Sequence, residues 1–434
     1  MSTPSLTQLA ADVAKHAKIL QDYIDANNLP QPAFDKDAPL DFPVPNGIPE
    51  QDSRIALLEA AKALHDLAVG PTSLVMWAGM NNKFDCVSLR AFDRYNIPEA
   101  VALEGETSFA SIAEKTGLDE DFVSRIIRFA STNRVFRETR PGWCIHTAAS
   151  RAMIENRGMR QFLGVMSDEV YEASAKVNAA EDLYHDSGEA DETAFQMACN
   201  TKEVYWHYLG LPGNESKKQR FAEGMGYLAS HPSAGLGETY AAEPLVDGYD
   251  WSGVGDGLMV DIGGSGGHIC QAIAKKHKNL RFIVQDLESV VSDAKVRLAN
   301  GTNPDDSRIE YMAHNFLEPQ PVQGADIYFL RFILHDWSDK YASMILRQIA
   351  PAMKKGSKIV VNDIVLPGPN EVPSTVEKIQ RSLDLSMMIV LNGKERTRSD
   401  WENLVAMADP RLKILSVSVP GALGIVEIGL KEDA

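Results

Sequence analysis

The position of His335 favours proton chemistry more than that of any other residue in the sequence. It follows the apolar run of residues 325–334, whose β-prone composition predicts a strand that is buried on both faces. Ligands of open α/β sheets bind just beyond the carboxyl ends of the strands, where an imidazole can accept a proton near neutral pH. A histidine at a strand end can also cap a helix or pair with the neighbouring Asp336. The residues around His335 decide between these alternatives.

Two carboxylates are expected at the same edge of the sheet. Asp363 lies on the next apolar strand, within residues 359–367, and Glu395 follows an apolar helix. Carboxylates on the two sides of an imidazole would hold its orientation and stabilise the imidazolium after proton transfer. Each acid on its own is more often an ordinary surface or strand-end carboxylate. Together with His335 they indicate a base with two supports.

A glycine-rich turn between a strand and a helix predicts a cofactor site. Residues 258–267 read LMVDIGGSGG, and Gly263, Gly264 and Gly266 allow the backbone to approach a ligand closely. The following helix N-terminus offers free N–H groups to a carboxylate or phosphate. The spacing departs from GxGxxG because position 269 is Ile, which argues against a nicotinamide dinucleotide. A turn required only for tight packing is the alternative.

Acids on both sides of this turn indicate which cofactor it would bind. Asp261 precedes the glycines and would repel a pyrophosphate, but its charge suits a cationic ligand with an amino acid end. Asp286, at the end of the next strand, can accept hydrogen bonds from both hydroxyls of a ribose. These features favour S-adenosylmethionine.

The second half of the chain alternates between β and α patterns, which predicts a doubly wound parallel sheet. We expect strands near 258–262, 281–286, 308–313, 325–334 and 358–366. Segments 412–419 and 425–430, separated by a Pro-Gly pair, predict an antiparallel hairpin that closes the sheet.

The first half of the sequence is predicted to be mostly helical. Helices over 5–27 and 51–68 flank a proline-rich arm, and 107–114 with 121–133 resemble a helix-turn-helix followed by a hairpin wing over 136–145. Phe122, Ile126 and Phe129 are expected to pack inward or across a dimer. The predicted division is an N-terminal arm (1–70), a helical region (71–240) that includes the wing, and a cofactor domain (241–434).

Composition excludes several classes of protein. The formal net charge of −17 over 434 residues argues against nucleic acid or an anionic membrane as the main partner. Arginines 125, 128, 134, 137 and 140 still leave a DNA-binding regulator as an alternative, unless they pair with acids. The four cysteines stand far apart, which predicts reduced thiols and no metal site. With no signal peptide and no membrane-length apolar run, we expect a cytoplasmic protein.

Several motifs together resemble a known family. The turn and Asp286 resemble motif I and the ribose acid of class I S-adenosylmethionine-dependent methyltransferases, over about residues 245–434. LHDWSD, the strand ending IVLP and NGKERT look like the small-molecule O-methyltransferases of the caffeic acid and flavonoid type, which include fungal enzymes of secondary metabolism.

The resemblance implies roles for individual residues. His335 would be the general base that deprotonates a phenol or other hydroxyl, with Asp363 and Glu395 beside it. Arg331 would contact the cofactor, and residues 311–317, with Asn315 and Phe316, would contact the adenine. The family also has a winged-helix dimerisation domain, which matches residues 71–150 and implies a homodimer.

Two departures from the family pattern concern site residues. Asn315 replaces the usual acid near the adenine, which should weaken one contact, and Asp363 stands where the longer Glu is commoner. By analogy, the helices before the cofactor domain and one helix within it supply a pocket for a flat aromatic or polyketide-like substrate, although such residues are often plain core. The candidates are Phe162, Met166, Trp206, Phe221, Met225, Met387 and Met388.

Some fungal relatives of this family catalyse dehydration or pericyclic ring closure, with S-adenosylmethionine as an electrostatic or structural element. The intact His335-Asp336 pair favours methyl transfer over this alternative.

Overall fold

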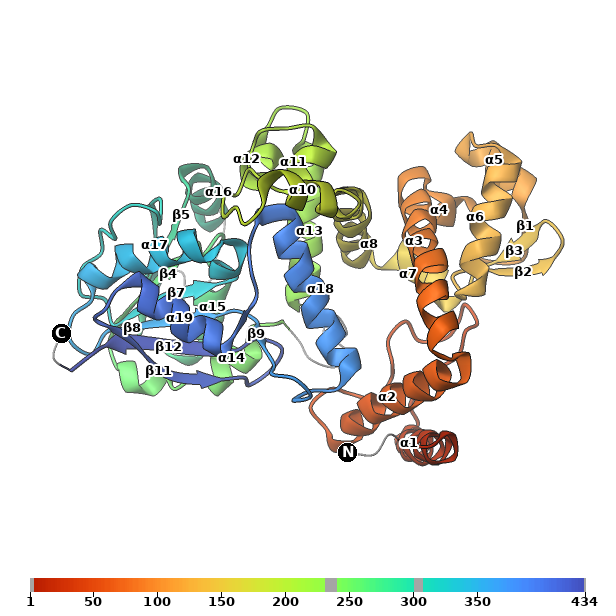
Figure 1. The fold of residues 1–434 in the computed structure, drawn as a ribbon, viewed down its shortest axis with the longest axis horizontal. Coiled ribbons are helices and arrows are strands. Elements are labelled where there is room, and N and C mark those ends of the chain that lie inside the picture. Colours follow the sequence, from red (N-terminus) through yellow and green to blue (C-terminus); the bar gives the residue numbers. More distant parts are fainter. Residues whose placement is uncertain (1–3, 231–239, 300–306, 433–434) are drawn as a thin grey trace. The chain divides into compact units, whose positions relative to one another are not determined.

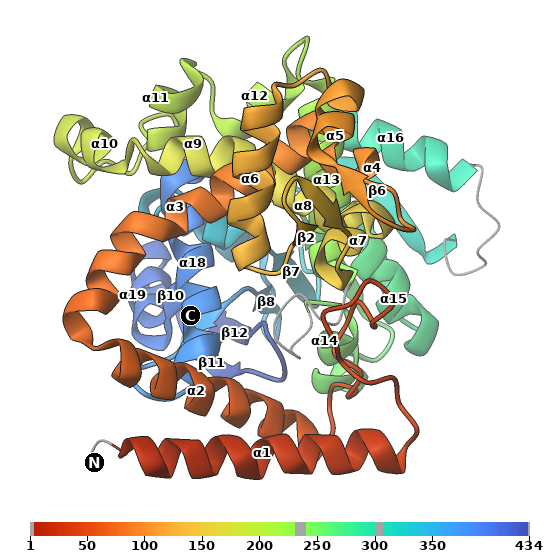
Figure 2. The ribbon, with the colours of Figure 1, turned by 90° about the vertical axis from the view of Figure 1, so that its right-hand side faces the viewer.

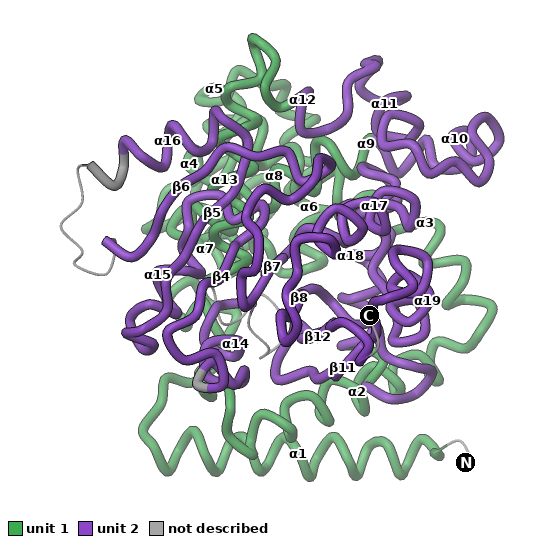
Figure 3. The backbone as a smooth tube through the Cα atoms, turned by 90° about the vertical axis from the view of Figure 1, so that its left-hand side faces the viewer, with its two compact units in different colours: residues 1–172, 209–238, 373–375 green, residues 173–208, 239–372, 376–434 purple. Residues whose placement is uncertain are grey.

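The computed structural model describes residues 4–230, 240–299 and 307–432, and it divides into two compact units (Figure 3). Unit 1 comprises Met1–Glu172, Leu209–Glu238 and Pro373–Thr375. Unit 2 comprises Ala173–Tyr208, Thr239–Val372 and Val376–Ala434. Each unit therefore takes segments from distant parts of the chain. The division at residues 70 and 240 stays a prediction.

Unit 2 is built on a seven-stranded mixed sheet with the order β11-β12-β8-β7-β4-β5-β6 (Figure 1). The strands from β8 to β6 in this order are parallel, whereas β12 runs antiparallel to both β8 and β11. The predicted doubly wound sheet with a closing hairpin is therefore confirmed. The strands are β4 (Leu258–Ile262), β5 (Arg281–Asp286), β6 (Ile309–Ala313), β7 (Ile327–Arg331), β8 (Lys358–Asn362), β11 (Leu412–Ser418) and β12 (Ile425–Leu430).

Alternate residues of the central strands face two separate apolar cores. Tyr328 and Leu330 of β7 pack into one core, while Ile327 and Phe329 pack into the other. This alternation follows from the period of two along a strand, and burial on both faces explains why β7 is almost entirely apolar.

Helices cover both faces of this sheet. The helices α17 (Asp339–Ile349) and α19 (Arg398–Ala408) contribute apolar residues to one core. The helices α14 (Glu243–Gly248) and α15 (His268–Lys276), with the 3₁₀ turn η2 (Trp251–Val254), contribute to the other. The remaining elements of unit 2 are α10 (Val177–Tyr184), α11 (Ala194–Cys199), α12 (Tyr205–Gly210, ending in unit 1), α16 (Glu288–Ala299), η4 (Leu334–Asp336), η5 (Ala350–Ala352), β9 (Val365–Leu366), α18 (Ser374–Leu391) and β10 (Arg396–Thr397).

Unit 1 is mostly helical, as predicted. Its long helices α1 (Leu6–Ala26) and α2 (Pro49–Val69) lie side by side (Figure 2), around a small apolar cluster that includes Leu20, Ile24 and Leu57. The other elements are α3 (Pro71–Tyr95), α4 (Ile97–Ala100), β1 (Thr107–Ser108), α5 (Phe109–Thr116), α6 (Glu120–Thr132), β2 (Arg137–Arg140), β3 (Trp143–Ile145), α7 (Ala148–Glu155), α8 (Arg157–Val165), the π-helix η1 (Met166–Val170), α9 (Tyr171–Ser174, ending in unit 2) and α13 (Glu215–Ser230).

The predicted helix pair and hairpin are present, with one addition. The hairpin β2-β3 turns at Pro141 and Gly142, and β1 pairs with β3 to make a three-stranded sheet. On α6, Val123 and Ile127 are buried and Ile126 packs partly against the same core, whereas Phe122 is 38% exposed, so its packing across a dimer stays a prediction.

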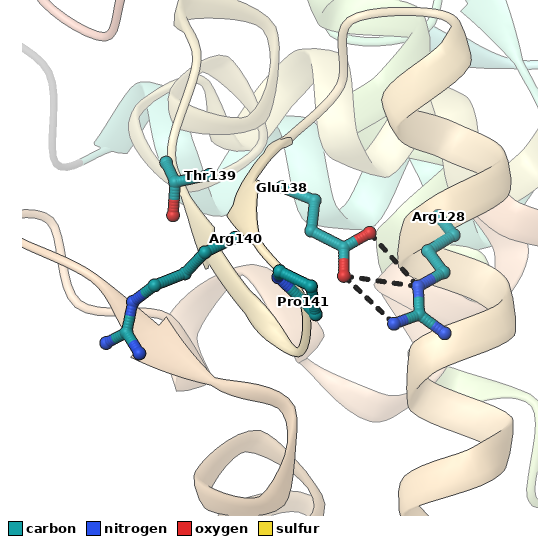
Figure 4. Close-up of a pocket in the computed structure, with 5 residues that line it drawn as sticks. All are labelled: Arg128, Glu138, Thr139, Arg140 and Pro141. Atoms are coloured by element: carbon teal, nitrogen blue, oxygen red, sulfur yellow. Dashed lines mark hydrogen bonds and ion pairs between the residues drawn. The ribbon is translucent and has the colours of Figure 1, made fainter.

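The arginines of this region are mostly engaged with carboxylates. Arg125 pairs with Asp121, Arg137 with Asp35 and Arg140 with Glu106. Figure 4 shows Arg128 facing Glu138 across a surface hollow that Thr139, Arg140 and Pro141 also line. These ion pairs satisfy most of the positive charge on which a DNA-binding interpretation depends.

No helix within the described ranges is long and apolar enough to cross a lipid bilayer.

Candidate active site

The glycine turn follows β4, at the point where the order of the strands in the sheet reverses, with β5 on one side and β7 on the other. Ligands of α/β sheets bind at such a point. Gly263 adopts φ +73° and donates its N–H to the Gln285 carbonyl at 2.8 Å. A Cβ at Gly264 would lie 2.5 Å from the Asp261 carboxylate. Glycine is therefore favoured at position 263 by the positive φ and at position 264 by the closeness of the Asp261 carboxylate.

Asp261 is 3% exposed, and its Oδ2 accepts a hydrogen bond from the Cys270 thiol at 3.2 Å. Burial raises the pKa of Asp261 to about 6, although the thiol hydrogen bond opposes this rise. Cys270 comes from α15, which begins directly after the turn. The sequence predicts a reduced thiol at Cys270 but does not place it in the cofactor site.

Asp286 ends β5, as predicted, and its two carboxylate oxygens are held by main-chain amides. Its Oδ2 accepts from the Ser265 N–H and its Oδ1 from the Leu287 N–H, both at 2.8 Å. Burial raises the pKa of Asp286, and these two amides lower it in part. The carboxylate is thus fixed beside the glycine turn, and each oxygen retains a lone pair for a ligand hydroxyl.

The predicted adenine segment, residues 311–317, begins within β6 and continues beyond its end at Ala313. Asn315 is exposed and accepts from the Leu317 N–H at 3.1 Å, while the ring of Phe316 meets that of Trp337 edge to face. Gly266 accepts a hydrogen bond from the Tyr311 hydroxyl at 2.9 Å, so this segment also supports the turn.

Arg331 is the last residue of β7, and protein groups hold its guanidinium. It donates to the Asn362 side chain and to the Tyr240 carbonyl. Burial lowers the pKa of Arg331 to about 10, and the charges of Asp363 and Asp261 oppose this change.

His335 lies in the short 3₁₀ turn η4, not at the end of a strand. The predicted strand over 325–334 is therefore too long, because β7 ends at Arg331 and Phe332 adopts φ +53°. The Phe332 N–H donates to Asp363 Oδ1 at 2.7 Å, which holds the chain in this turn. His335 remains at the carboxyl edge of the sheet.

The imidazole of His335 lies between two carboxylates. Its Nδ1 is 2.8 Å from Glu395 Oε1, and its Nε2 is 3.3 Å from Asp336 Oδ1. An ionised carboxylate only accepts, so in the neutral imidazole the close Glu395 contact places the single hydrogen on Nδ1 and leaves the lone pair on Nε2. The Glu395 main-chain N–H is in turn held by Asp384 Oδ1 at 3.0 Å.

The second predicted support, Asp363, lies one residue beyond the end of β8 and not on the strand. It is fully buried, it bonds to the Phe332 amide and not to the imidazole, and its charge still acts on His335. The sequence suggests Asp336 as an alternative partner of His335. In the structure both acids contact the imidazole, Asp336 at Nε2 and Glu395 at Nδ1.

The charges of this cluster are coupled. Burial lowers the pKa of His335, but the charges of Glu395 and Asp336 outweigh burial and raise it to about 10. Burial raises the pKa of Asp336 to about 7, and the charge of His335 opposes this rise. One imidazolium faces three carboxyl groups, so a proton on Asp336 relieves repulsion among the acids.

The predicted substrate residues are divided between the two units. Phe162 on α8, Met166 on η1, and Phe221 with Met225 on α13 belong to unit 1, where Gly224 lets α13 approach Phe162 closely. In unit 2, α12 carries Trp206 and α18 carries Met387 with Met388, which is 40% exposed. A common pocket made by both sets stays a prediction.

The residues at the glycine turn fit S-adenosylmethionine. Two fixed acids, Asp261 and Asp286, flank a turn in which a Cβ at Gly264 would intrude on the Asp261 carboxylate. A carboxylate attracts a cationic ligand, and a second one can accept from ribose hydroxyls. Among the residues that the structure describes, no cluster of His, Cys, Asp and Glu could hold a metal ion.

Comparison with known proteins gives relatives along almost the whole chain. Residues 235–409 match the family model of the O-methyltransferase domain. The grayanic acid biosynthesis cluster O-methyltransferase of Cladonia grayi is 34% identical over 97% of this chain and 87% of its own length. The chlorophenol O-methyltransferase of Trichoderma longibrachiatum is 33% identical over 94% of this chain and 86% of its own length.

Solved structures share the fold. OxaC in complex with SAH and oxaline is 24% identical over 98% of this chain and 99% of its own, with a TM-score of 0.73. A structure described as a pericyclic reaction enzyme is 25% identical over 96% of this chain and 99% of its own, with a TM-score of 0.67. The relatives, the fold and the cofactor turn agree, and the chain belongs to the family of S-adenosylmethionine-dependent O-methyltransferases.

Proposed function

We propose that this enzyme methylates a hydroxyl of a small aromatic or polyketide-like secondary metabolite, with His335 as the general base. The observation that carries the proposal is the 2.8 Å contact between His335 Nδ1 and Glu395 Oε1, which in the neutral imidazole leaves Nε2 to accept a proton. The chlorophenol enzyme among the relatives supports a phenolic acceptor.

The proposed mechanism assigns one task to each side chain of the cluster. Bound S-adenosylmethionine supplies a methyl group on a sulfonium, which an oxygen nucleophile can attack. His335 Nε2 takes the proton of the acceptor hydroxyl, so the oxygen gains nucleophilicity. Glu395 fixes the imidazole and, with Asp336 and Asp363, stabilises the resulting imidazolium.

At the cofactor turn, we propose that Asp261, Gly263, Gly264 and Gly266 hold the amino acid end and that Asp286 binds the ribose. Asn315, Phe316 and Arg331 would border the adenosyl moiety, since they follow β6 and end β7 at the same sheet edge. The predicted substrate residues are proposed as separate candidates for contact with the acceptor, in unit 1 on α8, η1 and α13 and in unit 2 on α12 and α18.

We further propose that the helix pair α5-α6 and the β1-β3-β2 sheet form a winged-helix module and that the enzyme is a cytoplasmic homodimer. Support for the module is the order of helix, helix and hairpin in unit 1. The four cysteines are free thiols, in keeping with a reducing compartment.

The deciding experiment follows the methyl group. The enzyme is incubated with methyl-labelled S-adenosylmethionine and a panel of phenols and hydroxylated polyketides, and the products are analysed by mass spectrometry. A labelled methyl ether supports the proposal. The alternative, a ring closure or dehydration without methyl transfer, is raised by the resemblance to a pericyclic reaction enzyme. An isomerised or dehydrated product without label would establish that alternative.

A further inference from the structure

Arg396 is a fully buried arginine beside the base, and the proposed mechanism assigns it no task. It is 1% exposed, and three of its nitrogens donate to groups near His335. Nη1 donates to the Leu334 carbonyl at 2.7 Å, Nη2 to the Trp337 carbonyl at 2.8 Å, and Nε to Asp339 Oδ1 at 2.9 Å. A buried guanidinium is stable only when it is paired and hydrogen-bonded in this way.

The two carbonyls lie on either side of the base. Leu334 directly precedes His335 and Trp337 follows it by two residues, so the fork of Arg396 spans the 3₁₀ turn that carries the imidazole. Because guanidinium is planar and rigid, its bonds to both carbonyls fix the turn in one orientation.

The same segment that supplies this fork also supplies Glu395. The Lys394 N–H donates to the His335 carbonyl at 2.9 Å, and Arg396 Nη1 also donates to the Lys394 carbonyl at 3.2 Å. A Cβ at Gly393 would lie 2.3 Å from the His335 carbonyl oxygen, so glycine is needed for the approach. Residues 393–396 therefore contact the main chain of the base turn on both sides of Glu395.

We propose that Arg396 is a positioning residue that sets the contact between His335 Nδ1 and Glu395 Oε1. It does so because its hydrogen bonds connect the main chain on both sides of His335 to the segment that carries Glu395. This inference rests on the proposed function, in which His335 is the base. Arg396 itself touches neither substrate nor cofactor in this scheme. Its effect passes through the geometry of the imidazole and its carboxylate.

The test is Arg396→Lys, which keeps the positive charge but cannot form the planar fork. Arg398→Lys is the matched control, because Arg398 lies two residues away, is 68% exposed in its side chain and pairs only with Glu402 at 3.4 Å among the ion pairs described. Both variants are compared with wild type in three measurements: kcat with an acceptor that the enzyme methylates, affinity for S-adenosylhomocysteine, and titration of the His335 imidazole by NMR. The His335→Gln variant identifies the imidazole resonance.

Arg396→Lys should lower kcat on the order of 10²-fold, because misplacement of a catalytic group by about 1 Å has that effect. Its cofactor affinity should stay within about twofold of wild type, since the glycine turn is untouched. The imidazole should titrate at lower pH, because a looser contact with Glu395 stabilises the imidazolium less. Arg398→Lys should change none of these quantities.

If Arg396→Lys does not fold, Asp339→Asn carries the test, since it leaves Arg396 in place and weakens the contacts of Nε and Nη2 with the Asp339 carboxylate. A smaller decrease in kcat and in the pH at which the imidazole titrates, at an unchanged melting temperature, supports the proposal. The positioning role alone is overturned if His335→Gln is inactive but Arg396→Lys or Asp339→Asn keeps the kcat and the imidazole titration of wild type. Full turnover by His335→Gln overturns the proposed base instead.

Discussion

The cofactor turn and the base cluster both contain buried or partly buried carboxylates, but the partners of these carboxylates differ. Asp261 and Asp286 accept from neutral donors, namely a thiol and two main-chain amides. Glu395 instead contacts an ionisable imidazole, and its Oε2, like Oδ2 of Asp363, has no hydrogen-bond partner in the described part of the chain.

This difference matches two kinds of chemistry. Neutral donors hold a carboxylate without cancelling its charge, so the turn keeps its attraction for a cationic cofactor. In the base cluster the negative charge acts on His335 and raises the proton affinity of the imidazole. Variants that affect one region and leave the other unchanged can therefore test the comparison.

The largest effect is expected from the base itself. His335→Gln should lower kcat by about 10³-fold, since general base catalysis contributes roughly 10²–10⁴-fold. Affinity for S-adenosylhomocysteine, measured by calorimetry, should remain unchanged because the imidazole does not contribute to the turn. A large loss of cofactor binding would contradict the separation of the two regions.

Glu395→Gln should lower kcat on the order of 10²-fold, because the imidazole loses the anion that orients it. The charge of Glu395 raises the pKa of His335, so its removal lowers that pKa. Only the neutral imidazole accepts a proton, and the rising limb of kcat/KM against pH should therefore move to lower pH. Glu402→Gln, at an exposed site on α19, is the control. A limb that stays in place or moves to higher pH contradicts the assignment.

Asp286→Ala should act on the other region. Loss of hydrogen bonds to a charged acceptor should weaken cofactor affinity by about 10- to 100-fold. At saturating cofactor kcat should recover to near the wild-type value, which a titration of rate against S-adenosylmethionine would measure. Unaltered affinity would be evidence against Asp286 as the ribose acid.

The smallest effect is expected at Cys270. Its thiol lowers the pKa of Asp261, so Cys270→Ala should raise that pKa and leave less negative charge on the turn near neutral pH. Affinity for S-adenosylmethionine should fall by about threefold at pH 6.5 and by less at pH 8.5, with Cys270→Ser closer to wild type because a hydroxyl still donates. An equal loss at both pH values would point to packing instead.

The cofactor turn could be predicted closely from the sequence because its parts are near one another in the chain. The strands β4 and β5 have the predicted bounds, and Asp286 lies where the strand pattern places it. Short apolar runs bounded by glycine and charged residues report local structure well.

The base cluster was less predictable because distant groups shape it. Residues 332–334 are apolar and extend the strand pattern, yet the Asp363 carboxylate and the Arg396 fork bind this stretch and turn it away from the sheet. These partners lie about 30 and 60 residues away, so no local pattern reveals them. On α6, Phe122 and Val123 begin two neighbouring apolar stripes, and packing within unit 1 buries the second more deeply.

The position of β12 in the sheet has a consequence for synthesis of the chain on the ribosome. This strand follows all the others of the sheet in chain order, yet it pairs with both β8 and β11 and lies between them. Folding during translation proceeds from the N-terminus. Until Leu430 has left the exit tunnel, β8 presents an unpaired edge beside the segment that carries Asp363. The sheet therefore stays incomplete until β12 has been synthesised, and until then that edge must be protected from aggregation.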